Sequence, residues 1–414
     1  MVHTNHLTEG GTSVPVVCPV MPYPALGGGH KRTLRLLEAL ERAGGIPHVL
    51  TTDPKPDGAE VLRERGWAVD ILDEPMPSHV RRMRQHLARL PSPHLDSVAR
   101  RLAQVVAEAP PFVQIEQTQS AYYDRELRGV RRVLSLHNVD SQMLETVARH
   151  ERPLSPTWAR AWNRTLAMRS VERRAVPRAD AVICVSDRDY LHFKRYAGKP
   201  LLAPNGADDE FFSVDERLPE NENVFFMGVY DYPPNANGVL RFLREGWPLL
   251  AAARPGARLR LAGKGMGEEL RRAVEESERV EALGFVDDLC PELERSRIVI
   301  VPLWQGGGTR LKVLEAMAAG RPVVGTTLGL EEVGVEAGRH AVIADTPAQM
   351  AEETAALLAD GERARRLAAE GRALAERFRW SVALRPVEEL YRRWLQQAAG
   401  SEPVVRERVR ARQS

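Results

Sequence analysis

The sequence predicts an α/β protein with two doubly wound domains. Its 414 residues exceed the length that one hydrophobic core usually serves, so two domains are expected. Short apolar runs of strand character alternate with helix-length segments, which is typical of parallel sheets covered on both faces. A turn at 204–206 and a charged, irregular stretch at 215–223 interrupt this alternation. We therefore expect two domains that face a central cleft, with a linker near 205–223.

The first series of elements is expected over 14–205. Its strands are predicted from short apolar runs at 14–20, 46–51, 112–115, 132–136 and 181–185. After the first strand, a helical pattern covers 30–43, where Leu34, Leu37 and Leu40 share one apolar face. Ligands of such sheets bind beyond the carboxyl ends of the strands, so the loops there are the first candidates for a site.

The second series is expected over 206–379. Its strands are predicted at 224–227, 258–262, 280–283, 297–303, 322–325 and 341–344. Helices are expected to begin near Asn237 and Thr309, and a long helix is expected over 347–377. A terminal helix over 380–398 follows.

The two ends of the chain differ from its interior. Residues 1–13 are polar and contain no signal-peptide pattern, and we expect them to be disordered. Residues 399–414 form a basic tail, which we expect to be flexible. The charge of the whole chain is nearly balanced, with 58 Lys and Arg against 56 Asp and Glu, so nucleic acid is not an expected partner.

The three cysteines indicate a reducing compartment. Cys18, Cys184 and Cys290 lie far apart in the sequence, and none forms a CxxC motif. No apolar run is long enough for a membrane span. We therefore expect a cytoplasmic protein.

The segment 298–324, IVIVPLWQGGGTRLKVLEAMAAGRPVV, carries the strongest functional signal. Three glycines (Gly306, Gly307 and Gly308) follow a buried strand, and Thr309 is placed to cap the next helix. Glycines allow backbone N–H groups to approach an anion closely, and a helix N-terminus adds partial positive charge. The pattern favours a phosphate site; a simple strand-to-helix turn is the alternative.

Charged residues in the same segment support this interpretation. Arg310 and Lys312 lie in the first turn, where the helix dipole disfavours cations unless a polyanion neutralises them. Glu315 lies inside an apolar run, where a carboxylate requires a partner. That partner could be a ligand, or it could be Lys312, three residues earlier on the same face.

Motifs along most of the chain resemble those of the retaining glycosyltransferases of family 4, which have the GT-B fold of two Rossmann-like domains. The resemblance is greatest to the branch found in bacterial exopolysaccharide systems. The motifs are PALGGGHKR near the N-terminus, SLHNVDS at 135–141, VSDRDY at 185–190, APNGADDEFF at 203–212, FFMGVYDYPPNANGVLRFL at 225–243, LAGKG at 261–265, LGFVDDL at 283–289 and the glycine-rich segment above.

The resemblance implies that the second domain binds a nucleotide-diphosphate sugar, which is the donor and a co-substrate. It also implies that the reaction needs no further cofactor and no metal. In the family, the glutamate matching Glu315 binds the donor ribose. A second glutamate usually lies eight positions earlier, where this chain has Gly307. The implied donor contacts are Gly28, Gly29, Lys264, Val286, Gly306, Gly307, Gly308, Thr309, Arg310, Lys312, Leu314 and Glu315.

The family's usual arginine after the first strand of this domain has no counterpart, because the chain has Gly228, Val229 and Tyr230 there. We therefore assign neutralisation of the diphosphate to Lys264, Arg310 and Lys312. A solvated turn lysine is the alternative for Lys264.

In the first domain, the resemblance places the loop at Gly28 and Gly29 near the diphosphate. It also implies that the terminal helix 380–398 crosses back onto this domain. It places His137 beside the transferred sugar, with Asn138 on the acceptor side. His137 also follows an expected strand, where a side chain faces a cleft more readily than the core; an ordinary hydrogen-bonded histidine is the alternative. The expected catalytic residues are His137, Arg310 and Lys312.

Three further features have less specific interpretations. Asp187 and Asp189 match the DxD metal motif formally, but Ser186 with Asp189 fits a helix capping box better, so no metal site is expected. The basic segments 79–89 and 158–174 are compatible with peripheral contact to an anionic membrane at its inner face. A solvated helix face is the alternative for both segments.

The expected function is transfer of a sugar from a nucleotide-diphosphate sugar to an acceptor, with retention of anomeric configuration. The acceptor could be a polysaccharide, a lipid-linked glycan or a small natural product. Two other functions are compatible with the same fold. One is a nucleotide-sugar epimerase, and the other is a catalytically silent partner of another transferase.

Overall fold

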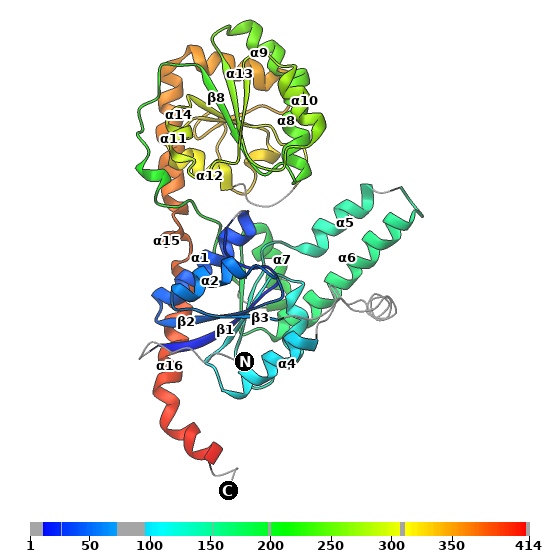
Figure 1. Cartoon of the computed structure of the whole chain (residues 1–414), viewed down its shortest axis with the longest axis vertical. Helices are drawn as coiled ribbons and strands as arrows, with labels where there is room; N and C mark the ends of the chain where they lie inside the picture. The colour runs from blue at the N-terminus through cyan, green and yellow to red at the C-terminus, as the bar shows by residue number, and fades with distance from the viewer. Residues whose placement is uncertain are drawn as a thin grey trace. The chain divides into compact units, whose positions relative to one another are not determined.

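A computed structural model of the chain describes residues 11–25, 27–72, 96–150, 152–197, 200–306 and 311–410. The chain divides into two compact units, each a parallel sheet with helices on both faces (Figure 1). The N-terminal unit comprises 1–203 and 384–414, and the C-terminal unit comprises 204–383. The α/β class and the two doubly wound sheets expected from the sequence are confirmed.

The N-terminal sheet has seven strands in the order β3-β2-β1-β4-β5-β6-β7, and all neighbours pair in parallel. Both faces of such a sheet are buried, which explains its continuous apolar runs. The order reverses between β1 and β4, so a ligand crevice is expected at their carboxyl ends. The strands are β1 (Thr12–Cys18), β2 (Gly45–Thr51), β3 (Ala68–Ile71), β4 (Val113–Glu116), β5 (Arg132–Ser135), β6 (Ala181–Cys184) and β7 (Leu201–Leu202).

Helices cover this sheet, and α1 buries Leu34, Leu37 and Leu40 against it as the sequence predicts. Two of the helices, α5 and α6, form a hairpin that projects from the body of the unit (Figure 1). The described helices of the unit are α1 (Gly28–Arg42), α2 (Pro56–Glu64), α4 (Asp96–Ala107), α5 (Asp140–His150), α6 (Pro156–Ala175), α7 (Asp187–Ala197) and α16 (Arg385–Arg410).

The C-terminal sheet has six strands in the order β10-β9-β8-β11-β12-β13, again with parallel neighbours. The order therefore reverses between β8 and β11, as it does between β1 and β4. The strands are β8 (Asn223–Met227), β9 (Arg258–Ala262), β10 (Val280–Gly284), β11 (Ile298–Val301), β12 (Val323–Gly325) and β13 (Val342–Ile343).

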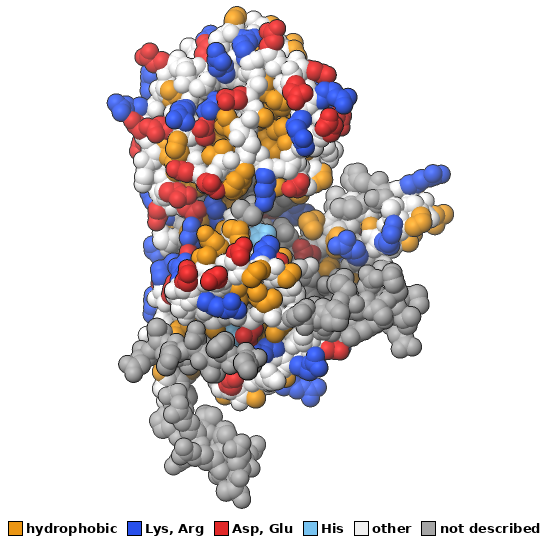
Figure 2. Space-filling view, viewed as in Figure 1, with side chains coloured by type: hydrophobic (Ala, Val, Ile, Leu, Met, Phe, Trp, Pro, Cys, Tyr) orange, Lys and Arg blue, Asp and Glu red, His pale blue; other side chains and the backbone are white. Residues whose placement is uncertain are grey.

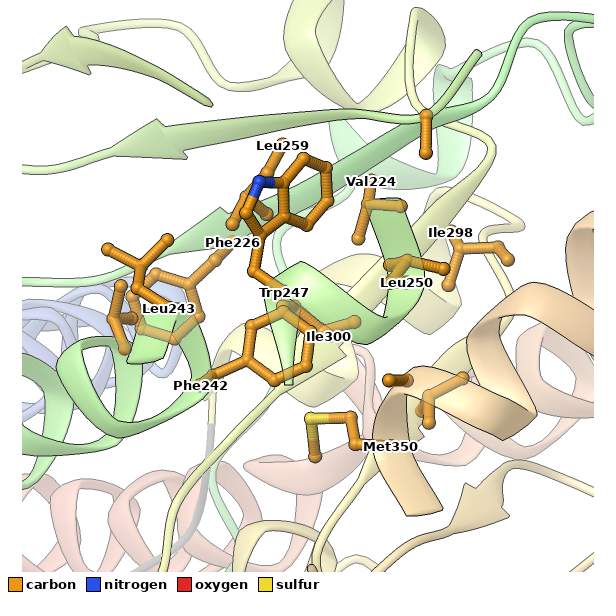
Figure 3. Close-up of a cluster of buried hydrophobic side chains, with 14 of the residues drawn as sticks. Val224, Phe226, Phe242, Leu243, Trp247, Leu250, Leu259, Ile298, Ile300 and Met350 are labelled. Carbon is orange, nitrogen blue, oxygen red and sulfur yellow. The ribbon is translucent and has the colours of Figure 1, made fainter. Parts of the chain in front are cut away.

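A large apolar cluster packs one face of the C-terminal sheet against its helices. Phe226 of β8 lies beside Phe242 and Trp247, which come from α8 and α9 (Figure 3). These aromatic side chains are almost fully buried, and truncating one of them would cost about 3–5 kcal/mol. The helices are α8 (Pro233–Glu245), α9 (Trp247–Ala253), α10 (Glu268–Glu275), α11 (Cys290–Glu294), α12 (Leu311–Ala318), α13 (Pro347–Ala359), α14 (Gly361–Ala375) and α15 (Trp380–Ala383).

The structure corrects the expected ends of the chain. Thr12 and Ser13 belong to β1 and pair with Gly45 and Ile46, so the expectation of disorder through residue 13 was wrong for these two residues. At the other end, α16 continues to Arg410, past the helix end expected at residue 398, and the flexibility of the tail stays a prediction.

Two internal expectations were also wrong. The long helix expected over 347–377 divides at Asp360, whose side chain accepts a hydrogen bond from the backbone N–H of Arg363 at 2.9 Å and thereby starts a new helix. The expected linker at 205–223 is packed into the C-terminal unit. Phe211 and Phe212 are buried there, which anchors the segment in an apolar cluster.

Candidate functional site

His137 lies at the carboxyl edge of the N-terminal sheet, where the topology predicts a ligand crevice. It follows β5, and its Nε2 atom is 2.8 Å from Oε2 of Glu116, the last residue of the neighbouring β4. The imidazole is 11% exposed, whereas the carboxylate is fully buried. The ring therefore reaches the surface from a polar anchor inside the unit.

The Glu116 carboxylate accepts further hydrogen bonds. The Thr33 hydroxyl donates to Oε2 at 3.3 Å, and the Gln114 side-chain amide donates to Oε1 at 2.6 Å. The Tyr391 hydroxyl of α16 donates to the Oε1 atom of Gln114. These side chains are all buried, and such a polar cluster is tolerated only because its groups bond to one another.

The first turn of α1 faces the exposed side of the His137 ring. A Cβ atom at Gly29 would lie 3.7 Å from His137 Nδ1 and 4.0 Å from Nε2 of Gln117. Of the residues expected in the first domain, the structure thus brings Gly29 and His137 together. Gly28 begins α1, and Asn138 follows His137 directly in the chain.

Burial raises the pKa of the nearby Asp140 carboxyl, at the start of α5, despite the proximity of His137 and a hydrogen bond from Thr118.

In the C-terminal unit, Lys312 of α12 reaches the loop that follows β8. Its ammonium donates a hydrogen bond to Asn235 Oδ1 at 2.7 Å and lies 4.3 Å from the centre of the Phe226 ring. A Cβ atom at Gly228 would lie only 2.7 Å from the same ammonium. The cation is therefore held at the carboxyl end of the central strand, against a glycine that leaves no room for a side chain.

Lys264 lies in the neighbouring loop, after β9. The backbone N–H of Tyr230 donates to the Lys264 carbonyl at 2.8 Å, so the loops after β8 and β9 are joined. A Cβ atom at Gly263 would lie 1.8 Å from the Gly228 carbonyl oxygen, and φ of Gly263 is +148°. Only glycine fits there, which explains the Gly-Lys-Gly sequence.

The glycine-rich loop after β11 is described only at its start. Gly306 has φ of +97°, and a Cβ atom there would lie 2.7 Å from the Tyr232 hydroxyl. Gly306 thus lies against the segment that follows β8. The predicted site residues Gly307, Gly308, Thr309 and Arg310 lie outside the described residues, as do those of the basic segment 79–89.

The remaining expected donor residues lie on or near α12. Glu315 is 7% exposed on a helix whose neighbouring residues are core. Leu314 is fully buried in an apolar cluster, so only its backbone could reach a ligand. The side chain of Val286 packs against the same cluster.

Four residues of these arrangements were not predicted from the sequence. They are Gln114, Glu116, Tyr391 and Asn235. A buried strand that reads VQIE carries polar residues at alternate positions, and this was the available signal for Gln114 and Glu116. Asn235 lies in an ordinary-looking helix start, and nothing local marks Tyr391 as a partner of β4.

Ser186 precedes α7, where the sequence predicts a helix cap. The backbone N–H of Asp189 donates to Ser186 Oγ at 3.2 Å, which confirms the predicted cap of α7. Within the described ranges, no group of three or more His, Cys, Asp or Glu side chains could hold a metal ion. No helix in this part of the chain is long and apolar enough to cross a membrane.

Comparison with known proteins identifies the family. A family model described as "Glycosyltransferase Family 4" matches residues 26–211, and one described as "Glycosyl transferases group 1" matches 221–360. The chain is 26% identical over 355 residues to a phosphatidyl-myo-inositol mannosyltransferase of Mycobacterium tuberculosis, covering 80% of this chain and 90% of the relative. A protein of the same name from Propionibacterium freudenreichii is 31% identical over 257 residues, covering 58% and 64%.

Solved structures agree with this result at the level of the fold. The sucrose-phosphate synthase from Thermosynechococcus elongatus superposes with a TM-score of 0.67 at 21% identity, covering 93% of this chain and all of that one. The Anabaena HepE protein in complex with UDP and glucose gives 0.65 at 18%, covering 92% and 99%. The two family models together span most of the chain, and both sheets match the GT-B architecture. The chain belongs to the glycosyltransferases of family 4.

Proposed function

We propose that this glycosyltransferase takes its sugar from a nucleotide-diphosphate donor bound by the C-terminal unit, and that the anomeric configuration is retained. The observation that supports this most is the placement of Lys312. Its ammonium is fixed by Asn235 next to Gly228, at the carboxyl end of the central strand. Open α/β sheets bind nucleotides at this position, and a fixed cation there suits a diphosphate.

The proposed chemistry is departure of the nucleoside diphosphate, assisted by positive charge. Lys264 lies in the loop after β9, which is joined to the loop after β8, and Lys312 of α12 reaches the segment that follows β8. Arg310 is assigned to the same role from the sequence. A cation that is already in place stabilises developing negative charge without reorganisation, and each such group contributes about 3 kcal/mol. No metal ion is part of this proposal.

Two further residues have proposed roles. Glu315, buried on α12, binds the donor ribose through its carboxylate. His137, at the surface of the N-terminal unit, contacts the transferred sugar, with Asn138 toward the acceptor. His137 is 11% exposed, as a ring that touches a ligand from a rigid base would be.

The relatives guide the choice of substrates. HepE has been solved with UDP and glucose and with UDP-glucose, so UDP-sugars are the first donors to test. The mannosyltransferases are named for phosphatidyl-myo-inositol, so a lipid-linked acceptor is the first acceptor class to test. Polysaccharide and small natural-product acceptors follow.

The projecting α5–α6 hairpin suits peripheral contact with the inner, cytoplasmic face of an anionic membrane. Leu154 at its tip is 87% exposed, and Met143 and Leu166 are exposed on its sides. Exposed arginines lie beside them, and orange and blue side chains occur together on this hairpin in Figure 2. Such a mixture inserts apolar groups at the headgroup level while the arginines meet anionic lipid. Cys18, Cys184 and Cys290 are free thiols, which suits a reducing compartment.

Thermal-shift screening against UDP-, GDP-, TDP- and ADP-sugars tests the donor proposal. A donor that binds only the folded protein raises the melting temperature by mass action. The donor that stabilises the protein is then incubated with lipid-linked acceptors, and the anomeric configuration of the product is read by NMR. Absence of any shift, or an altered sugar without an acceptor, would contradict the proposal; the second result is that of an epimerase.

A further inference from the structure

The hydrogen bonds around Glu116 fix the direction of a chain that ends at His137. An ionised carboxylate only accepts hydrogen bonds, so the ring atom Nε2 that lies 2.8 Å from Glu116 must carry a proton. The Gln114 amide must likewise turn its NH2 group to Glu116, which leaves its oxygen for the Tyr391 hydroxyl. Burial and the charge of Glu116 raise the pKa of Tyr391 well above its usual value, so that hydroxyl remains a donor.

When the imidazole of His137 is neutral, its other ring nitrogen, Nδ1, is a hydrogen-bond acceptor. A neutral imidazole with a proton on Nε2 has its lone pair on Nδ1. Nδ1 is the atom that lies 3.7 Å from the position of a Cβ at Gly29, in the first turn of α1. Because Glu116 is fully buried and bonded on both oxygens, the ring has a single supported orientation.

A hydrogen-bond donor, the side-chain amide of Gln117, lies beside His137 Nδ1. The oxygen of the Gln117 amide accepts from Nε2 of Gln119 at 3.2 Å, so its NH2 group is the part directed to Gly29. Gln117 also has φ of +65°, a conformation that costs energy in a residue other than glycine and that collects at functional sites. The strained backbone turns this side chain toward the crevice edge of the sheet.

We propose that His137 Nδ1 and Gln117 Nε2 form an acceptor–donor pair for one sugar hydroxyl, and that Glu116, held by Gln114 and Tyr391, is the positioning residue that sets the pair. A hydroxyl donates one hydrogen bond and accepts others, so it matches both atoms at once. The inference rests on the proposed function for the nature of the ligand. The proton position on His137 does not depend on it.

This proposal explains why the N-terminal sheet contains a buried polar cluster around Glu116. Apolar side chains of similar volume would stabilise the sheet at least as well as a buried polar network. The cluster instead links α16, the last helix of the chain, to the functional edge of the sheet through Tyr391, which also stacks on Phe112 with ring centres 5.4 Å apart. It therefore transmits a fixed side-chain geometry from the core to the surface.

The test uses Glu116→Gln in the full-length protein. The Gln114 amide still donates to position 116, so the new glutamine must present its own NH2 group to His137. The ring proton is then expected to move from Nε2 to Nδ1, which nitrogen-15 NMR of the imidazole detects; comparison with His137→Gln assigns the signal. We expect kcat to fall about 10- to 100-fold, as when a carboxylate behind a functional histidine is lost, with donor binding nearly unchanged.

Two matched variants complete the test. Tyr391→Phe keeps the stacking on Phe112 but frees the Gln114 amide, so a mixture of ring tautomers and a smaller loss of kcat are expected. Gln117→Glu keeps the size of the side chain but replaces the donor with an acceptor, so kcat should fall while the His137 tautomer stays as in the wild type.

The outcomes are separable. An unchanged tautomer in folded Glu116→Gln protein overturns the positioning role, whatever the activity. A full kcat in Gln117→Glu overturns the acceptor–donor pair. A wild-type protein that transfers no sugar refutes the proposed function, while the NMR signal still decides whether Glu116 sets the ring.

Discussion

The two sheets of this protein share the order of their first six strands, and the N-terminal sheet adds β7, but equivalent strands carry different side chains. β4 lies next to the central β1 as β11 lies next to the central β8. β11 reads IVIV and is entirely apolar, whereas β4 reads VQIE and buries an amide and a carboxylate. The N-terminal sheet thus orients a surface histidine from within. At the C-terminal sheet, closely packed glycines follow the strands, and Lys312 of α12 supplies a positive charge beside Gly228.

The difference teaches how one topology serves two tasks. The parallel arrangement places all carboxyl ends at one edge, and this is common to both units. Whether the edge presents a histidine supported by a buried carboxylate or a lysine packed against a glycine depends on a few residues. Four variants, ordered by expected effect, would sharpen or break this comparison.

Lys312→Ala should have the largest effect, because it removes the fixed cation from the C-terminal edge. We expect kcat/KM to fall about 100-fold, equivalent to about 3 kcal/mol of transition-state stabilisation. Gly228→Ala is the matched variant: its methyl group would displace the ammonium without removing the charge, and a smaller loss is expected. Steady-state kinetics with the best donor measures both. Full activity of Lys312→Ala would show that the C-terminal edge does not depend on this lysine.

Arg321→Met should have the largest effect on stability. Arg321 is fully buried, and its guanidinium donates to the carbonyls of Arg217 and Ser296 at 3.3 Å and of Ala319 at 2.9 Å. Burial lowers its pKa to about 10, against the pull of nearby Asp215. Loss of these bonds leaves buried carbonyls unpaired, so unfolding should become easier by about 3 kcal/mol.

Urea denaturation measures this change, and Arg217→Gln is the control. The Arg217 side chain is 90% exposed, so its replacement should alter the free energy of unfolding little. An equal loss in both variants would show that the segment near 215–217 is held by surface charge rather than by the buried arginine.

Glu315→Gln should weaken donor binding while the fold is retained. We expect a loss of about tenfold in affinity, which corresponds to about 1.4 kcal/mol. The reason is the proposed contact of the buried carboxylate with the donor ribose. Calorimetric titration with the donor found by thermal shift measures it. Unchanged affinity would remove Glu315 from the site and assign it to the packing of α12.

Asp70→Asn should have the smallest effect, a loss of stability that is present above about pH 4 and disappears at acid pH. Burial alone would raise the pKa of Asp70, but hydrogen bonds from His48 and Arg101, at 2.9 and 2.6 Å, outweigh it and lower the pKa to about 2. A carboxyl whose pKa is lower in the folded state stabilises the fold above its unfolded pKa near 3.8. That contribution is lost as the pH falls toward 2.

Solvent screening limits this contribution to about 1 kcal/mol, since the carboxylate is partly exposed. Thermal melting between pH 5 and about pH 2 measures the effect, with the difference between wild type and variant shrinking toward the acid end. A constant difference over this range would show that Asp70 stabilises the N-terminal unit through packing and not through its charge.

The sequence was sufficient for some elements and not for others. Long apolar runs at β1, β2 and β9 were predicted within two residues, because hydrophobic periodicity is a local signal. β3 and β7 were missed, since edge strands of four and two residues are too short to give a periodic pattern. The helix at 347–377 was predicted as continuous because its apolar pattern continues past the cap at Asp360.

In the candidate site, too, some features could be predicted from the sequence and others could not. Glycines before a capped helix, with cations in its first turn, are local patterns, and they indicated Gly306 and Lys312 directly. The partner of each functional group was not local. Asn235 lies 77 positions from Lys312, and Tyr391 lies 277 positions from Gln114.

The sequence by itself determined the α/β class, the division into two doubly wound sheets and the glycine-rich, cationic edge of the second. It did so because periodicity, caps and glycine conformations act between near neighbours in the chain. Only the tertiary structure decided that Glu116 supports His137, that Arg321 anchors the segment at 215–217, and that Lys312 meets Gly228. Each of these depends on parallel strands that bring distant residues to one edge, where buried polar groups must find partners.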